Sequence, residues 1–167
     1  KLAYMLQALD TLPQPLIGRI HANAFGGGVG LASVCDIAIG VEGALMGLTE
    51  TRLGLIPATI GPYVVARMGS ANARRVFMSG RRFDAHEAQT LGLLAKVVAP
   101  DALDDAIEAE VTPYLSCAPG AVADAKALVR ALSTLIDAQT IEHTIEALAQ
   151  RWESPESLEG ISAFFEK

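Results

Sequence analysis

Residues 23–31 read Asn23-Ala24-Phe25-Gly26-Gly27-Gly28-Val29-Gly30-Leu31, and they lie between an apolar run typical of a strand and one typical of a helix. Consecutive glycines let the backbone turn sharply and let a ligand approach the peptide groups, because no Cβ is in the way. If a helix begins here, its first N–H groups have no partner within the helix and carry partial positive charge. The stretch is therefore a candidate site for a phosphate, a carboxylate or a transient oxyanion.

Composition limits the classes of protein to consider. The 167 residues are 51% hydrophobic and 19% charged, enough for one well-filled core and too few for two ordinary domains. The net charge of −6 argues against nucleic acid or an anionic membrane surface as a partner. The longest apolar stretch, residues 29–41, is interrupted by Asp36 and is too short to span a bilayer.

The two cysteines, Cys35 and Cys117, lie in apolar surroundings and have no CxxC spacing. A disulfide or a metal pair is the less favoured interpretation, and two buried thiols of a cytoplasmic protein are expected. No signal peptide is visible, but this carries little weight because the chain begins without an initiator Met. The chain begins at Lys1 in a helical pattern, so we expect the sequence to lack a natural N-terminal part.

Apolar patterning predicts an α/β core followed by helices. Strands are expected at residues 16–20, 36–39, 44–48 and 95–98, and helices at 2–9, 29–34, 62–68, 71–78 and 84–92. The strand–helix–strand order over residues 16–39 implies a right-handed parallel crossover. Asp84 and Glu87 have the spacing of a capping box, and residues 50–61 are typical of a loop.

The pattern beyond Pro100 is wholly helical, which suggests a division into a core, 1–99, and a helical segment, 100–167. We expect this segment to pack on the core or on a neighbouring subunit. Its apolar faces are Leu103, Ala106, Ile107, Val111 and Tyr114, then Val122, Ala125 and Val129, and then Ile141, Ile145, Leu148 and Trp152.

Three kinds of anion could bind at the glycine turn. No lysine follows the glycines, so a phosphate-binding P-loop is excluded. A dinucleotide turn requires GxGxxG, and its third glycine is replaced by Leu31 or Ser33 in the two possible frames, although Glu50 lies about where a ribose-binding acid would. The remaining anion is an oxyanion formed during a reaction, such as the enolate of a thioester, which a fixed backbone N–H stabilises.

Residues 20–39 closely resemble the signature of the crotonase (enoyl-CoA hydratase/isomerase) superfamily, and the resemblance continues through residues 46–57, 79–85, 92–93 and 159–164. Residues 49–58 are most similar to bacterial methylglutaconyl-CoA-hydratase-like members, which act on branched or carboxylated substrates. The resemblance implies a crotonase-like ββα spiral core with a C-terminal helical segment. Family chains are longer, and we expect the N-terminal strand-rich part to lie outside this sequence.

The resemblance also implies residue roles. Gly27 corresponds to one of two backbone donors of the oxyanion hole, and the second donor is expected outside this sequence. The hydratases use two glutamates; one corresponds to Glu50 and the other to Gly30, so one carboxylate is missing. The implied substrate-binding residues are Asn23, Phe25, Gly26, Thr49 and Ala58.

The implied substrate is an acyl-CoA, with coenzyme A as part of it and no further cofactor or metal. The implied assembly is a homotrimer or a dimer of trimers, with the C-terminal helices at subunit contacts. No nucleic-acid or membrane partner is expected.

Glu50 stands out from the residues alone, because it ends an apolar strand and its only charged neighbour is Arg52. Partial desolvation would raise its pKa towards the range useful for general acid–base catalysis. The alternative is a surface glutamate paired with Arg52. His21 is expected as a core histidine within a strand rather than as a substrate contact. The pairs Arg74-Arg75 and Arg81-Arg82 are expected on solvated faces or subunit contacts, though either could reach the phosphates of CoA.

The sequence thus predicts an enoyl-CoA hydratase that adds water across the α,β double bond of an acyl-CoA. The alternative within the family is a Δ3,Δ2-enoyl-CoA isomerase that uses a single glutamate. A non-catalytic relative that binds acyl-CoA or RNA is a third possibility. The acidic charge counts against RNA, and the presence of Glu50 counts against a catalytically dead protein.

Overall fold

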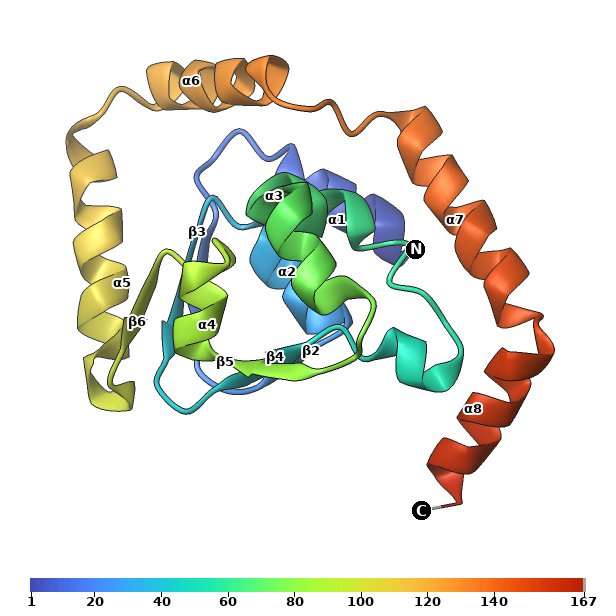
Figure 1. Ribbon diagram of the computed structural model, residues 1–167. Helices are drawn as coiled ribbons and strands as arrows, with labels where there is room; N and C mark the ends of the chain where they lie inside the picture. The colour runs from blue at the N-terminus through green and yellow to red at the C-terminus, as the bar shows by residue number, and fades with distance from the viewer. Residues whose placement is uncertain (167) are drawn as a thin grey trace.

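Two small sheets and the helices packed on them form the body of the protein in the computed structural model, which describes residues 1–166 (Figure 1). The first sheet has the order β1-β3-β6, with β1 (Ile17–Ile20), β3 (Ile37–Val41) and β6 (Lys96–Val98) all parallel. In its register Ile17 lies opposite Ile37, and Ile39 lies opposite Lys96. The predicted parallel connection between the first two strands is therefore confirmed.

The second sheet carries the glycine turn. It joins β2 (Ala24–Phe25) in parallel to β4 (Leu45–Gly47), which pairs antiparallel with β5 (Arg82–Asp84). The sequence did not predict β2 or β5. Strands of two and three residues are too short to show an alternating pattern, and they form because β4 supplies their hydrogen-bond partners.

Helix α2 (Gly27–Val34) connects the two sheets and is central to the main core. It packs on α3 (Gly61–Phe77) and on α1 (Leu2–Asp10). Leu6, Val29 and Val64 are fully buried in this core. Gly69, with φ 73° and ψ 153°, breaks α3 into two parts, which agrees with the two helices predicted there.

Helix α4 (Ala85–Thr90) begins as the capping pattern predicts, because Asp84 Oδ1 accepts a hydrogen bond of 2.8 Å from Glu87 N. The turns η2 (Pro100–Ala102) and η3 (Thr112–Ser116) flank α5 (Leu103–Val111). Helix α5 packs on β1 and β3, where Leu103 and Ala106 join Ile39 and Val41 in a second core cluster.

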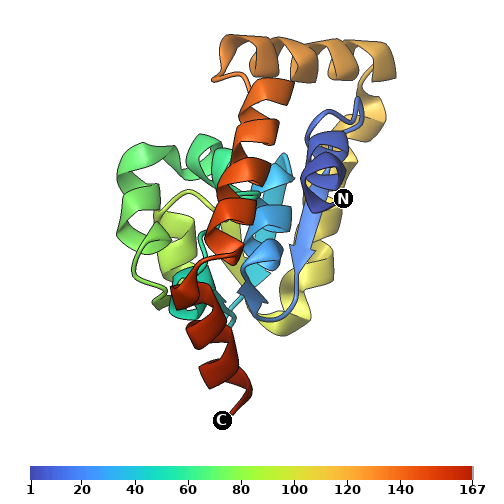
Figure 2. The ribbon, with the colours of Figure 1, turned by 90° about the vertical axis from the view of Figure 1, so that its right-hand side faces the viewer.

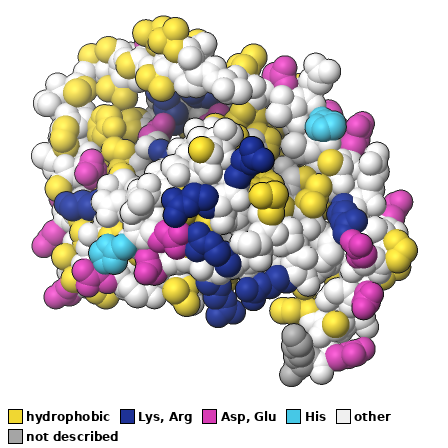
Figure 3. All heavy atoms as spheres, viewed as in Figure 1, with side chains coloured by type: hydrophobic (Ala, Val, Ile, Leu, Met, Phe, Trp, Pro, Cys, Tyr) yellow, Lys and Arg dark blue, Asp and Glu magenta, His cyan; other side chains and the backbone are white. Residues whose placement is uncertain are grey.

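The last three helices, α6 (Pro119–Leu132), α7 (Ala138–Trp152) and α8 (Pro155–Phe165), form an arm around the body (Figures 1 and 2). Apolar side chains line the top of this arm (Figure 3). Helix α6 contains no buried residue, and Val129 is 64% exposed, so the burial expected for its face is not found within the described chain. In α7, Ile141 is buried but Trp152 is 53% exposed.

Two further expectations are wrong. Cys117 is exposed because it follows η3 in the connection to α6, whereas Cys35 is buried as expected, and both are free thiols. His21 is exposed because β1 ends at Ile20, one residue before it. No helix within residues 1–166 is long and apolar enough to cross a membrane.

Candidate active site

The glycine turn presents free N–H groups at the start of α2. Gly26 precedes the helix with φ 50°, a backbone conformation that glycine adopts without steric cost. Its carbonyl accepts from Val29 N and Gly30 N at 2.9 and 3.1 Å. Within residues 1–166 the N–H groups of Gly27 and Gly28 have no acceptor. These two donors carry the partial positive charge of a helix N-terminus.

Glu50 lies directly against this turn. It is the first residue of η1 (Glu50–Leu53), a 3₁₀ turn that follows β4. Its Oε1 lies 3.0 Å from the position that a Cβ on Gly26 would occupy, so a larger residue there would push the carboxylate away by a few tenths of an ångström. Its Oε2 is buried and has no hydrogen-bond partner in the part of the chain that the structure describes.

The environment of Glu50 makes its charged form less favourable than it is in water. Burial raises the pKa of this carboxyl, and a backbone hydrogen bond at Glu50 itself opposes the shift. No ion pair joins Glu50 to Arg52 among the described residues, so the alternative of a surface pair is not what the structure holds. A partly desolvated carboxylate that belongs to no ion pair among the described residues can take up and return a proton, as a general acid–base group must.

The glycines of the turn differ in the space around them. A Cβ on Gly27 would meet no atom within 4 Å, so a ligand can approach the peptide there. A Cβ on Gly30 would lie 2.3 Å from Ile60 Cγ2 and 2.9 Å from Ile60 Cβ. The side chain of Ile60 therefore fills the space next to position 30, and a side chain there would require Ile60 to shift.

A cavity of about 570 Å³ opens beside the site. Two of its lining residues, Phe25 and Thr49, directly precede Gly26 and Glu50 in the sequence. Arg82 also lines it, with its Cζ 5.3 Å from the centre of the Phe25 ring, as does Arg52. Neither arginine belongs to an ion pair among the described residues. The cavity combines apolar walls with two free guanidinium groups.

The structure brings together most, but not all, of the predicted site residues. Gly26, Gly27 and Glu50 meet at the turn. Asn23 lies in an exposed loop, where its Oδ1 accepts a hydrogen bond of 2.8 Å from Leu45 N, so it braces the second sheet. Ala58 lines a separate cavity of about 670 Å³ between α3 and α7.

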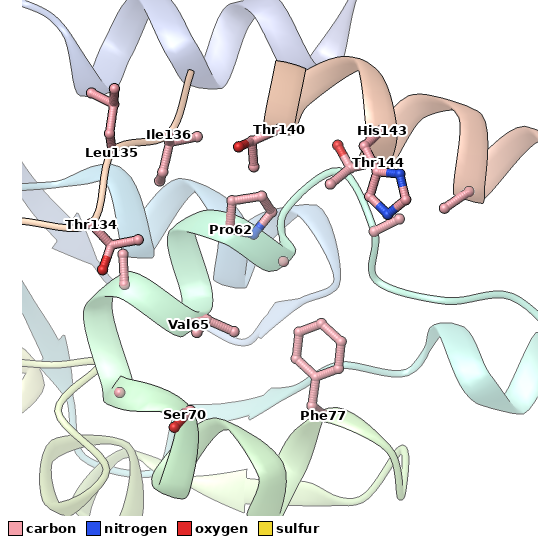
Figure 4. A pocket seen from close by; sticks show the side chains of 15 residues that line it. Pro62, Val65, Ser70, Phe77, Thr134, Leu135, Ile136, Thr140, His143 and Thr144 are labelled. Atoms are coloured by element: carbon pink, nitrogen blue, oxygen red, sulfur yellow. The ribbon is translucent and has the colours of Figure 1, made fainter. Parts of the chain in front are cut away.

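Figure 4 shows that separate cavity, where Pro62 and Phe77 face His143 and Thr144 across the gap between the two helices. Sequence reasoning did not assign Arg52 or Phe164 to the wall of the cavity beside Glu50. The resemblance over residues 159–164 was the available signal for Phe164. Within residues 1–166, no cluster of His, Cys, Asp and Glu side chains could hold a metal ion.

Comparisons with known proteins show the family of this chain. A model of the Enoyl-CoA hydratase/isomerase family matches residues 1–167. YngF of Bacillus subtilis (strain 168), named only provisionally as an enoyl-CoA hydratase/isomerase, is 39% identical over 167 residues, covering 95% of this chain and 62% of YngF.

Two crystal structures are also similar. An enoyl-CoA hydratase from Shewanella pealeana is 41% identical with a TM-score of 0.76, covering 99% of this chain and 62% of that chain. An enoyl-CoA hydratase from Mycobacterium avium is 30% identical with a TM-score of 0.87, and the match covers 99% of this chain and 65% of that chain. The chain therefore belongs to the enoyl-CoA hydratase/isomerase family, the crotonase superfamily. It spans 62% of the length of YngF.

Proposed function

We propose that the full-length protein is an enoyl-CoA hydratase. The observation that carries this proposal is the half-buried carboxylate of Glu50, whose Oε2 has no hydrogen-bond partner within residues 1–166, held against Gly26 and next to the N–H of Gly27. The thioester carbonyl would accept a hydrogen bond from Gly27 N–H, which polarises the conjugated double bond. A fixed donor of this kind stabilises the enolate oxygen as negative charge develops on it.

Glu50 would move the proton. As a water oxygen bonds to the β-carbon, the carboxylate takes one proton from that water, and the electron pair of the double bond shifts to the thioester oxygen as an enolate. The protonated carboxyl then returns the proton to the α-carbon, and the carbonyl re-forms. The raised pKa of Glu50 suits both halves of this cycle, because the group must first accept and then release a proton near neutral pH.

Isomerisation of 3-enoyl-CoA to 2-enoyl-CoA is the second candidate, and the contact between position 30 and Ile60 favours it. A single carboxylate can remove a proton from C2 and return it to C4 without adding water. Hydration by two carboxylates would need the second one to come from a position other than 30.

One assay on the full-length protein separates these reactions. Hydration of 2-enoyl-CoA removes the absorbance of the conjugated enoyl-thioester, whereas isomerisation of 3-enoyl-CoA produces it. We expect the absorbance to fall with the 2-enoyl substrate. Binding of acyl-CoA with no change in either assay would instead indicate a non-catalytic relative.

For the acyl group we propose a branched or carboxylated chain of the methylglutaconyl kind. Arg52 and Arg82 support this, because their guanidinium groups line the cavity beside Glu50 and form no ion pair within residues 1–166. The test compares kcat/KM for a carboxylated enoyl-CoA and an uncharged enoyl-CoA of equal length. Arg82→Gln should lower the first value selectively. An equal effect on both substrates would point to the CoA phosphates instead.

We also propose a cytoplasmic homotrimer or dimer of trimers that uses no cofactor beyond the CoA of its substrate. The exposed apolar residues of the arm, such as Leu128 and Leu132, support an assembly that covers them. Light scattering coupled to size-exclusion chromatography tests this, and a monomeric mass would reject it.

A further inference from the structure

The position of the Glu50 carboxylate is set by the backbone of η1. No side-chain hydrogen bond holds Oε2 in the described chain, so the carboxylate depends on where the turn places its Cα. The turn is closed by hydrogen bonds from Gly54 N to Thr51 O at 3.2 Å and from Leu55 N to Glu50 O at 3.1 Å. Contacts that fix the backbone of η1 therefore also fix the position of the Glu50 carboxylate.

Helix α8 touches the turn backbone to backbone. A Cβ on Gly54, which ends η1 with φ 70°, would lie 2.4 Å from Glu156 O and 2.7 Å from Ser157 N. A Cβ on Gly160, one turn further along α8, would lie 2.6 Å from Leu53 C and 2.8 Å from Leu53 O. Two glycines, one on each side, therefore let the helix and the turn approach more closely than any other residue would permit.

Arg151 fastens the same contact from the end of α7. Its Nε donates a hydrogen bond of 2.6 Å to Gly54 O, and its guanidinium pairs with Glu156 in the first turn of α8. A charged donor makes a stronger hydrogen bond than a neutral one. Arg151 thus links α7, α8 and the turn that carries Glu50.

The remainder of α8 buries little apolar surface, although Gly160, Ala163 and Phe164 line the cavity beside Glu50. Leu158, Phe164 and Phe165 are 64%, 61% and 80% exposed. Among the described elements, α8 packs most extensively on η1. The main attachment of the C-terminal helix is therefore the turn that carries Glu50, rather than the hydrophobic core.

We propose that Gly160 and Arg151 are positioning residues for Glu50: through η1 they fix the carboxylate relative to the N–H of Gly27. This inference rests on the proposed function, in which Glu50 moves the proton. Relieving a contact of 2.6 Å to ordinary van der Waals distance requires a shift of about 1 Å, and a misplacement of about 1 Å at a catalytic group typically lowers the rate by about 10²-fold.

The first test measures kcat and KM of full-length Gly160→Ala with 2-enoyl-CoA. We expect kcat to fall about 10- to 100-fold while KM changes by less than about threefold. Gly120→Ala is the matched control, because Gly120 lies in α6 and a Cβ there meets no atom within 4 Å. It should leave kcat within about twofold of the wild type.

A double-mutant cycle separates positioning from general loss of structure. If Gly160 acts through Glu50, then Glu50→Gln lowers kcat much less in the Gly160→Ala protein than in the wild type. Independent, multiplicative losses would overturn the inference, as would a Gly160→Ala protein with normal kcat. If Glu50→Gln alone has no effect, the proposed function fails instead.

Arg151 supplies a second variant in case Gly160→Ala does not fold. Arg151→Met removes the donor to Gly54 O and should lower kcat at nearly constant KM. Arg151→Lys keeps a charged donor and should recover part of the loss. Equal activity of Arg151→Met and the wild type would contradict a positioning role.

Discussion

Substituting alanine for Gly30 tests how tightly the space beside the site is filled. The added Cβ would lie 2.3 Å from Ile60 Cγ2 and 2.9 Å from Ile60 Cβ, and the second atom cannot swing away because it is the branch point of the side chain. Overpacking of a core costs about 1–3 kcal/mol, and so short a contact belongs near the upper end. Alanine in a helix recovers about 0.5–1 kcal/mol relative to glycine.

The net expectation for Gly30→Ala is a loss of about 2 kcal/mol of unfolding free energy. For a chain of this size that corresponds to a Tm lower by about 4–8 °C. Ile60→Ala alone should also destabilise, by about 2–5 kcal/mol, because Ile60 is only 2% exposed and its loss leaves a cavity. The two changes together should cost less than their sum by about 1–2 kcal/mol, because each relieves the defect of the other.

Urea denaturation of the four proteins, at one protein concentration, measures this coupling. Gly120→Ala is the matched control and should lose no stability, because its Cβ meets no atom within 4 Å. Strictly additive effects of Gly30→Ala and Ile60→Ala would refute the argument that Ile60 occupies the space next to position 30. They would also reopen that space to a second carboxylate.

Three further results are expected. Burial raises the pKa of Glu50, so the folded protein binds this proton more tightly than the unfolded chain and loses stability as pH rises through the folded pKa. The Tm of Glu50→Gln should therefore match that of the wild type at about pH 4 and exceed it at about pH 8. A difference in Tm that does not depend on pH would contradict this. Gly27→Pro removes the proposed oxyanion donor at the first position of α2, where proline is well tolerated. We expect kcat to fall about 10²–10³-fold while the melting curve stays normal. Unchanged turnover would exclude Gly27 N–H as the donor. Asp84→Ala removes the N-cap of α4 and should lower the free energy of unfolding, measured by urea denaturation, by about 1 kcal/mol without altering kcat. An unchanged free energy of unfolding would mean that the Asp84–Glu87 hydrogen bond contributes nothing to stability.

Local chemistry made several features of the site predictable from the sequence. The glycines from Gly26 onward predict a tight turn before a helix, and Glu50 is recognisable in the sequence as an isolated acid after an apolar strand. The structure places these two features in contact and raises the pKa of the glutamate in the direction expected. The glycine turn and the isolated acid are each local patterns in the sequence, which is why they could be predicted, whereas their contact is a product of the fold.

Features that depend on distant residues were not predictable. Nothing in the sequence indicates that Ile60 fills the space beside Gly30, or that Gly160 meets Leu53. The two-residue strand β2 exists only because β4 pairs with it. Such contacts are set by tertiary packing, which a single sequence does not display.

The C-terminal arm also shows that a sequence pattern does not reveal which contacts a helix makes. The apolar face of α6 was visible in the sequence, but its exposure in the described chain was not. Apolar periodicity predicts which face of a helix is apolar, but it does not identify the surface that covers this face. The division of the chain at residue 99 likewise remains a prediction.

The most direct test of the role of Glu50 is the turnover of full-length Glu50→Gln with 2-enoyl-CoA, measured beside its affinity for acyl-CoA. The substitution keeps the size of the side chain and removes its ability to exchange a proton. We predict that kcat falls about 10²–10⁴-fold while acyl-CoA binding is little changed. A variant with near-normal kcat would contradict the assignment of Glu50 as the group that moves the proton.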